Sequence, residues 1–108
     1  MTVGTLANLD GFEAVILPYP DRDIEGVYIG DLLSWVMGRC ESGDAWLTIM
    51  SNVNILAVAT LSDVATIILT EGVSLTDDII ATAKEKGINI LCTELSSYQC
   101  ACRLAGIL

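Results

Sequence analysis

The middle of the chain alternates apolar strands with an apolar helix. Residues 46–50 (WLTIM) are mostly apolar, a polar turn follows at 51–54 (SNVN), and residues 53–64 have the pattern of an almost wholly apolar helix. A β-branched strand then spans residues 66–69. Strands without polar alternation are typical of sheets covered by helices on both faces. A helix that is apolar nearly all round is expected to be buried on more than one side, within the domain or against a second subunit.

The flanking segments continue the alternation and carry helix-boundary signals. Asp31 fits the N-cap of a helix, and Ser74 or Thr76 fits the N-cap of a later one. Ser96 and Gln99 have the spacing of a capping box. The expected elements are a helix within residues 2–9, strands at 12–17 and 26–30, a helix at 32–40, a helix ending at Gly87, a strand at 88–92 and a final helix after Ser96.

A strand followed by a helix recurs about three times along the chain, after a hairpin-like start. This order predicts an α/β fold, a layered α/β/α domain with a central, mostly parallel sheet. A length of 108 residues corresponds to one domain, residues 1–108.

Composition narrows the classes of partner. The hydrophobic fraction is 53% and the mean hydropathy is +0.60, which is high for a small soluble chain. We therefore expect a homodimer that buries part of the excess, the alternative being an Ala- and Ile-rich core with isolated exposed apolar residues. The net charge is −9 and the five basic residues are scattered, so binding to nucleic acid or to an anionic membrane is not expected.

The expected cellular location, and with it the expected redox state of the cysteines, depends on whether the sequence contains a membrane span or a secretory signal. No apolar tract reaches the length of a membrane span, and the amino terminus does not resemble a secretory signal. The expected location is the cytoplasm, where the four cysteines would be reduced thiols. The chain contains no histidine and no C-x-x-C motif, so no metal site and no cofactor are expected.

Polar residues follow several of the expected strands and form the candidate ligand site. The carboxyl ends of parallel strands meet at one edge of a sheet, where α/β proteins commonly bind ligands. Free N–H groups at a helix start could hold a carboxylate or a phosphate there. The alternative is that the asparagine and aspartate side chains only cap helices. The candidates are Asp31, Ser51, Asn52, Asn54, Glu71, Glu94 and Ser96.

Catalytic constellations are not recognisable. A serine hydrolase needs a histidine base and a nucleophile elbow, neither of which the sequence contains. Glu71 and Glu94 could be imagined as a glycosidase pair, but no aromatic platform for a sugar accompanies them. We therefore expect no catalytic residues.

Three segments resemble those of small stand-alone DRTGG-domain proteins of anaerobic bacteria. They are residues 27–35 (VYIGDLLSW), 43–46 (GDAW) and 92–98 (CTELSSY). Thr70-Glu71-Gly72 resembles the Thr-Gly-Gly part of the family's pentapeptide, with Glu71 in place of a glycine. The resemblance implies a fold similar to the amino-terminal domain of bacterial HPr kinase/phosphorylase, and a regulatory or subunit-pairing role. Such proteins are often labelled serine kinases, but this chain has no phosphate-cradling G-x-x-x-x-G-K-[ST] loop.

The leading hypothesis is a non-catalytic regulatory and dimerisation module that binds a partner protein or a small anionic ligand. The alternative is a pure interaction subunit of a metabolic or signalling complex, without a small-molecule ligand. A small enzyme is the third possibility.

Overall fold

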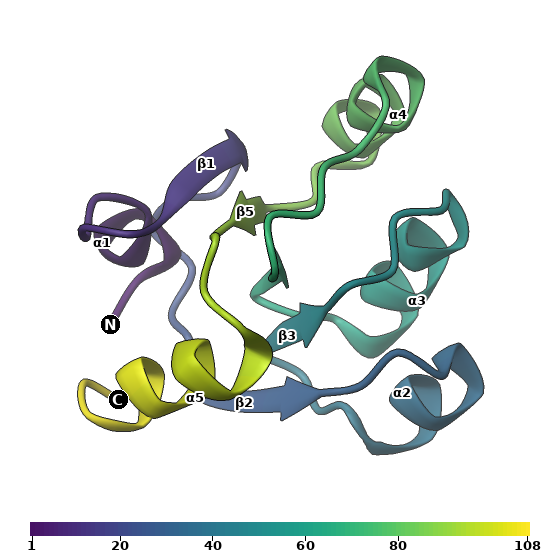
Figure 1. Ribbon diagram of the computed structural model, residues 1–108. Coiled ribbons are helices and arrows are strands. Elements are labelled where there is room, and N and C mark those ends of the chain that lie inside the picture. The colour runs from purple at the N-terminus through teal and green to yellow at the C-terminus, as the bar shows by residue number, and fades with distance from the viewer.

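The strands form one five-stranded sheet in the order β1-β5-β4-β3-β2 in the computed structural model, which describes residues 1–108 (Figure 1). Strands β2 to β5 are mutually parallel, and β1 runs antiparallel to β5 at one edge. The strands are β1 (Glu13–Ile16), β2 (Gly26–Ile29), β3 (Asp44–Thr48), β4 (Thr66–Leu69) and β5 (Ile90–Cys92). The helices are α1 (Val3–Ala7), α2 (Leu33–Arg39), α3 (Asn54–Ser62), α4 (Asp77–Lys86) and α5 (Ser97–Ala105).

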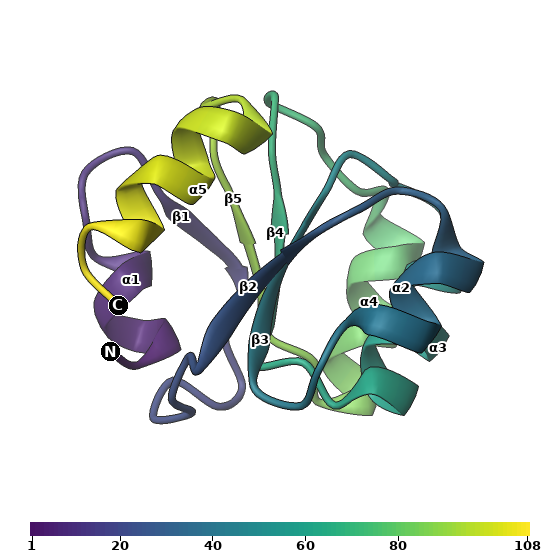
Figure 2. The same cartoon turned by 90° about the horizontal axis from the view of Figure 1, so that it is seen from below.

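The helices form a layer on each face of the sheet, which confirms the predicted α/β/α architecture with a mostly parallel sheet. Figure 2 views the sheet edge-on, with α1 and α5 on one side and α2, α3 and α4 on the other. Alternate side chains of the central strands point to opposite faces of the sheet and belong to two separate cores. Trp46 and Ile67 face α2 to α4, whereas Leu47 and Ile68 face α1 and α5. Because both faces are covered, the strands show no polar alternation.

Several local signals give the boundaries that the sequence predicts. Thr76 is the N-cap residue of α4, and Gly87 ends that helix with a left-handed φ of 68°. Ser96 and Gln99 form both hydrogen bonds of the capping box at the start of α5. No helix is long and apolar enough to cross a lipid bilayer.

The prediction of a hairpin-like start to the chain is wrong. β1 pairs with β5 and β2 pairs with β3, so these two consecutive strands lie at opposite edges of the sheet. The connection between them contains Pro18 and Pro20 and bonds instead to the start of α1, where Gly4 N donates to Pro20 O at 2.8 Å. A segment held in this way crosses the end of the sheet and does not form a tight turn.

The expectation that Asp31 caps a helix is also wrong. Asp31 does not cap α2, because Leu32 is the N-cap residue and the Asp31 carboxylate turns toward β3. Within the domain, helix α3 packs one face on the sheet, while Val53 just before it and Leu61 near its end are 50% and 70% exposed, so burial of its other side would need a second subunit. The domain itself offers no second layer to cover that outer face.

Candidate functional site

The parallel strands bring the predicted site residues to one edge of the sheet, as expected. This carboxyl edge is held by threonines that end β3 or directly follow β4 and β5. Thr48 Oγ1 donates to Asp31 Oδ1 at 2.7 Å, Thr70 Oγ1 lies 2.7 Å from Ser97 Oγ, and Thr93 Oγ1 donates to Gly11 O at 2.7 Å. All three threonines are buried, so these bonds satisfy hydroxyls that would otherwise destabilise the fold.

Asp31 and the 51–54 turn lie beside each other at this edge. Asp31 Oδ1 also accepts a hydrogen bond from Ile49 N at 3.0 Å, which ties the β2–α2 connection to the β3–α3 connection. Asn52 Oδ1 accepts from Asn54 N at 2.9 Å, so the Asn52 side chain bonds to the first residue of α3, although the N-cap residue is Val53. The Asn52 side-chain oxygen is therefore used within the chain, and Ser51 and Asn54 remain exposed beside it.

Glu71, Glu94 and Ser96 lie on the next two connections, which are also bonded together. Glu71 N donates to Leu95 O at 2.8 Å, and Gly72 N donates to Thr93 O at 3.0 Å. The Glu94 carboxylate lies over Gly72, where an added Cβ would be 2.5 Å from Glu94 Oε2. Ser96 is occupied as the N-cap of α5.

A cavity of about 690 Å³ opens at this edge, between the α1–β1 connection and the ends of β4 and β5. Among the predicted residues only Glu94 lines it, together with Asp10, Glu13 and Cys92. Its charged side chains are all acidic, and burial followed by Glu13 and Glu94 raises the pKa of the Cys92 thiol. The charged lining of this cavity therefore does not favour an anion.

A second cavity, of about 520 Å³, lies at the opposite, amino edge of the sheet. It is enclosed by the Pro18–Arg22 segment, the last turns of α3 and α4, and the residues that lead into β4 and β5. Val64, Ala65 and Ile88 give it a buried apolar floor, while Tyr19 and Lys86 are exposed at its rim. None of the predicted site residues reaches it.

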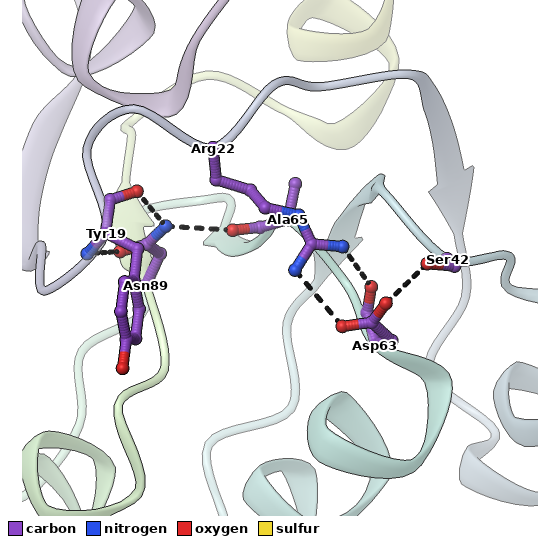
Figure 3. Close-up of polar contacts among 6 residues, drawn as sticks. All are labelled: Tyr19, Arg22, Ser42, Asp63, Ala65 and Asn89. Carbon is purple, nitrogen blue, oxygen red and sulfur yellow. Dashed lines mark hydrogen bonds and ion pairs between the residues drawn. The ribbon is translucent and has the colours of Figure 1, made fainter.

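The buried Asn89 holds the Pro18–Arg22 segment over this cavity (Figure 3). Asn89 Nδ2 donates to Tyr19 O at 2.8 Å and to Ala65 O at 3.0 Å, and Asn89 Oδ1 accepts from Tyr19 N at 2.9 Å. The side chain thus makes three hydrogen bonds while its residue is only 4% exposed. It acts as a fixed anchor, and its amide is not free to bind a ligand.

Arg22 fixes the other end of the same segment. Its Nη1 donates to Asp63 Oδ1 at 3.1 Å and its Nη2 donates to Asp63 O at 2.9 Å, at the end of α3 (Figure 3). Hydrogen bonds from Arg22 and then from Ser42 hold the pKa of the Asp63 carboxyl below its usual value of 3.8. Asp63 therefore supports the fold above that pH, and its contribution is lost only as the pH falls below it.

Sequence reasoning missed the amino-edge cavity because its residues come from three separated segments. Tyr19 and Asn89 are 70 residues apart in the chain. The one local signal is the Pro-Tyr-Pro run at 18–20, which predicts an extended segment but not the residue that anchors it.

Burial raises the pKa of the thiols of Cys40, Cys92 and Cys100. All four cysteines are free, and the pKa is raised to about 12 at Cys40 and to about 11 at Cys100. Cys100 is buried and Cys102 is exposed, as their i, i+2 spacing on a helix predicts.

Glu71 occupies a backbone conformation that favours glycine, with φ of 60°, and Gly72 follows with φ of 72°. A residue other than glycine in the left-handed conformation destabilises the folded state by roughly 1–2 kcal/mol. Replacing it with glycine removes this strain, but part of the gain is lost because glycine has greater conformational freedom in the unfolded chain. We predict that Glu71→Gly stabilises the protein by about 0.5–1 kcal/mol in urea unfolding. Gly72→Ala should destabilise it, since the added Cβ meets Glu94. Equal effects of both changes would contradict this account of the turn.

Comparisons with known proteins bear on the fold and the family. The sequence model of the DRTGG domain matches residues 21–107. No curated protein sequence matches the chain. A similar solved structure is the CBS and DRTGG regulatory region of Clostridium perfringens pyrophosphatase, complexed with its activator diadenosine tetraphosphate, with 22% identity and a TM-score of 0.65. The match covers 86% of this chain but 40% of that one, and at this identity it supports the fold alone. The chain belongs to the DRTGG domain family.

Proposed function

We propose that this chain is a non-catalytic, single-domain regulatory module that forms a homodimer and binds a small anionic ligand or a partner protein. We further propose that it works in the cytoplasm. The proposal agrees with the regulatory setting of the DRTGG domain in the clostridial pyrophosphatase. It also agrees with the absence of histidine and of a phosphate-cradling loop from the sequence.

The observation that carries the proposal is the set of large apolar side chains left exposed on the α2 and α3 side of the sheet. None of these side chains belongs to either core cluster or packs against one. In a chain with a net charge of −9, such a surface is best explained by contact with another protein surface. Its members are Leu32, Trp35, Met37, Ile49, Val53 and Leu61.

The amino-edge cavity is the better of the two cavities for a small anion. Its volume lies within the range of ligand pockets. It is lined by Arg22 and Lys86, two of the five basic residues of the chain, and by the acidic Asp21 and Asp63, whereas the charged residues of the carboxyl-edge cavity are all acidic. Arg22 is paired with Asp63, and Lys86 forms no ion pair. A ring could lie on the apolar floor beside Tyr19 while Lys86 and the remaining Arg22 donors contact a phosphate or carboxylate.

A thermal-shift screen of nucleotides and phosphorylated metabolites tests the ligand part, because a compound that binds the native state raises its apparent stability. We expect a shift that Lys86→Ala weakens and Lys84→Ala leaves unchanged. Lys84 lies on the same helix but outside the cavity. A shift that survives Lys86→Ala would move the site elsewhere.

The alternative is a pure interaction subunit of a metabolic or signalling complex. It has the support of the same exposed apolar surface and would bind no small molecule. No shift with any compound, together with a dimeric mass in light scattering, favours this alternative.

A further inference from the structure

Arg22 and Asp63 both line the amino-edge cavity, and each is the other's partner. The two terminal nitrogens of Arg22 donate to Asp63, Nη1 to the carboxylate Oδ1 at 3.1 Å and Nη2 to the backbone carbonyl at 2.9 Å (Figure 3). This end of the guanidinium is the edge that binds a carboxylate or a phosphate through two parallel hydrogen bonds. A ligand that reaches Arg22 therefore meets an edge that the chain already uses.

Asp63 is held in place without Arg22. Ser42 Oγ donates to the second carboxylate oxygen, Oδ2, and Gly43 N donates to the Asp63 carbonyl at 2.9 Å. The Asp63 amide donates to Thr60 O, as part of the C-cap of α3. Arg22 has a long side chain that is 35% exposed. The pair can therefore open by movement of the Arg22 side chain alone.

The charges that line the cavity cancel. Arg22 and Lys86 contribute two positive charges, and Asp21 and Asp63 contribute two negative ones. An anion that contacts Arg22 also lies close to the Asp63 carboxylate, which repels it. Lys86 forms no ion pair, so Arg22 is the cation whose availability to a ligand is set by another residue of the chain.

We propose that Asp63 is an internal competitor for Arg22, and that the phosphate of a phosphate monoester displaces it when the ligand binds. This inference rests on the small-anion site of the proposed function and names the class of ligand. A carboxylate ligand would only exchange one carboxylate partner of Arg22 for another. A phosphate monoester carries a charge of about −1.5 to −2 and three acceptor oxygens, so it gains more from pairing with Arg22 and Lys86.

Asp63→Asn separates the charge of this side chain from its structural role. Asp63 has a left-handed φ of 55°, a conformation that asparagine adopts more readily than most residues. The asparagine oxygen can still accept from Arg22 Nη1, and the backbone carbonyl that accepts from Nη2 is unchanged. The variant therefore keeps the Arg22 side chain in position and loses only the negative charge that competes with the ligand.

The affinity for phenyl phosphate, measured by NMR titration of isotopically labelled protein, tests the proposal, because amide shifts also locate the bound compound. We expect Asp63→Asn to lower the Kd about two- to fivefold, the range typical of a pair of exposed charges. Glu85→Gln changes the net charge equally, is exposed and lies outside the cavity, so it should leave the Kd unchanged. Damage to the fold can only raise the Kd. An unchanged or higher Kd in Asp63→Asn would overturn the proposal.

The same change in an Arg22→Ala background shows whether Asp63 acts through Arg22. The gain from Asp63→Asn should largely disappear there. A gain that persists in full would overturn the competition, because repulsion by Asp63 would then be the whole effect.

Benzoate, which has the same ring with a carboxylate, tests the class of ligand. It should bind the wild type at least about threefold more weakly than phenyl phosphate. Equal affinities would overturn the preference for phosphate. If phenyl phosphate shifted no amide of the cavity in the wild type or in Asp63→Asn, the small-anion site of the proposed function would fall together with this inference. Binding in the cavity without a tighter Asp63→Asn complex would overturn the inference alone.

Discussion

Replacing Asn89 with aspartate should destabilise the protein more than any other single polar change, by about 3 kcal/mol or more at neutral pH. The carboxylate would face the carbonyl oxygens of Tyr19 and Ala65, to which the Asn89 amide now donates. Two donated hydrogen bonds are lost, and a buried negative charge lies against two acceptors. The Pro18–Arg22 segment should then separate from the amino-edge cavity. Urea unfolding measures the loss.

The pH dependence of Asn89→Asp identifies the cause. The new carboxyl should have a raised pKa in the folded state, because its protonated form can still donate one hydrogen bond. The folded protein then binds more protons than the unfolded one, so the variant should regain stability as the pH falls from 7 toward about 4. Asn54→Asp, an exposed change at the start of α3, should stay within about 0.5 kcal/mol of wild type. A pH-independent loss at Asn89 would contradict this explanation.

The second large effect is expected at Trp46, the largest fully buried side chain. Its Nε1 donates to Gly30 O at 2.9 Å and so connects β3 to the β2–α2 connection. Trp46→Phe removes this hydrogen bond and leaves a cavity, at an expected cost of about 2–4 kcal/mol. The loss is measured by chemical unfolding. Because Trp35 remains in Trp46→Phe, the unfolding is followed by circular dichroism of the backbone and not by tryptophan fluorescence.

A matched control for Trp46 is Trp35→Phe. Trp35 is exposed, so this change should alter the stability of the monomer by no more than about 0.5 kcal/mol. Comparable losses at the two positions would contradict the assignment of Trp46 to the core and of Trp35 to the surface.

Local features of the fold could be predicted from the sequence where neighbouring residues determine them. The strand at 66–69 has the predicted bounds because its β-branched run is framed by a helix end and by Thr70-Glu71-Gly72. The final helix begins where the Ser96 and Gln99 spacing places it. The position of β1 could not be predicted in this way, since its partner β5 is more than 70 residues later in the chain.

The candidate site was predictable only as a location. The parallel strands do bring Asp31, the 51–54 turn, Glu71 and Glu94 to one edge. However, local and cross-strand hydrogen bonds already use Asp31, Asn52 and Ser96, and the cavity at that edge is acidic. The cavity with basic residues depends on Asn89, whose anchoring role arises only from long-range packing. Ligand binding at the seven predicted residues and the likeness to the HPr kinase domain stay predictions.

The mass in solution of the wild type, Trp35→Glu and Tyr98→Glu tests the central claim most directly. Tyr98 is the matched control, because it is 77% exposed but lies on α5, on the other side of the sheet. The three proteins are compared by light scattering at the same micromolar concentration. We predict twice the chain mass of 11.5 kDa for the wild type and for Tyr98→Glu, and the mass of a single chain for Trp35→Glu. A wild-type mass of 11.5 kDa, or a dimer that Trp35→Glu leaves intact, would contradict the account.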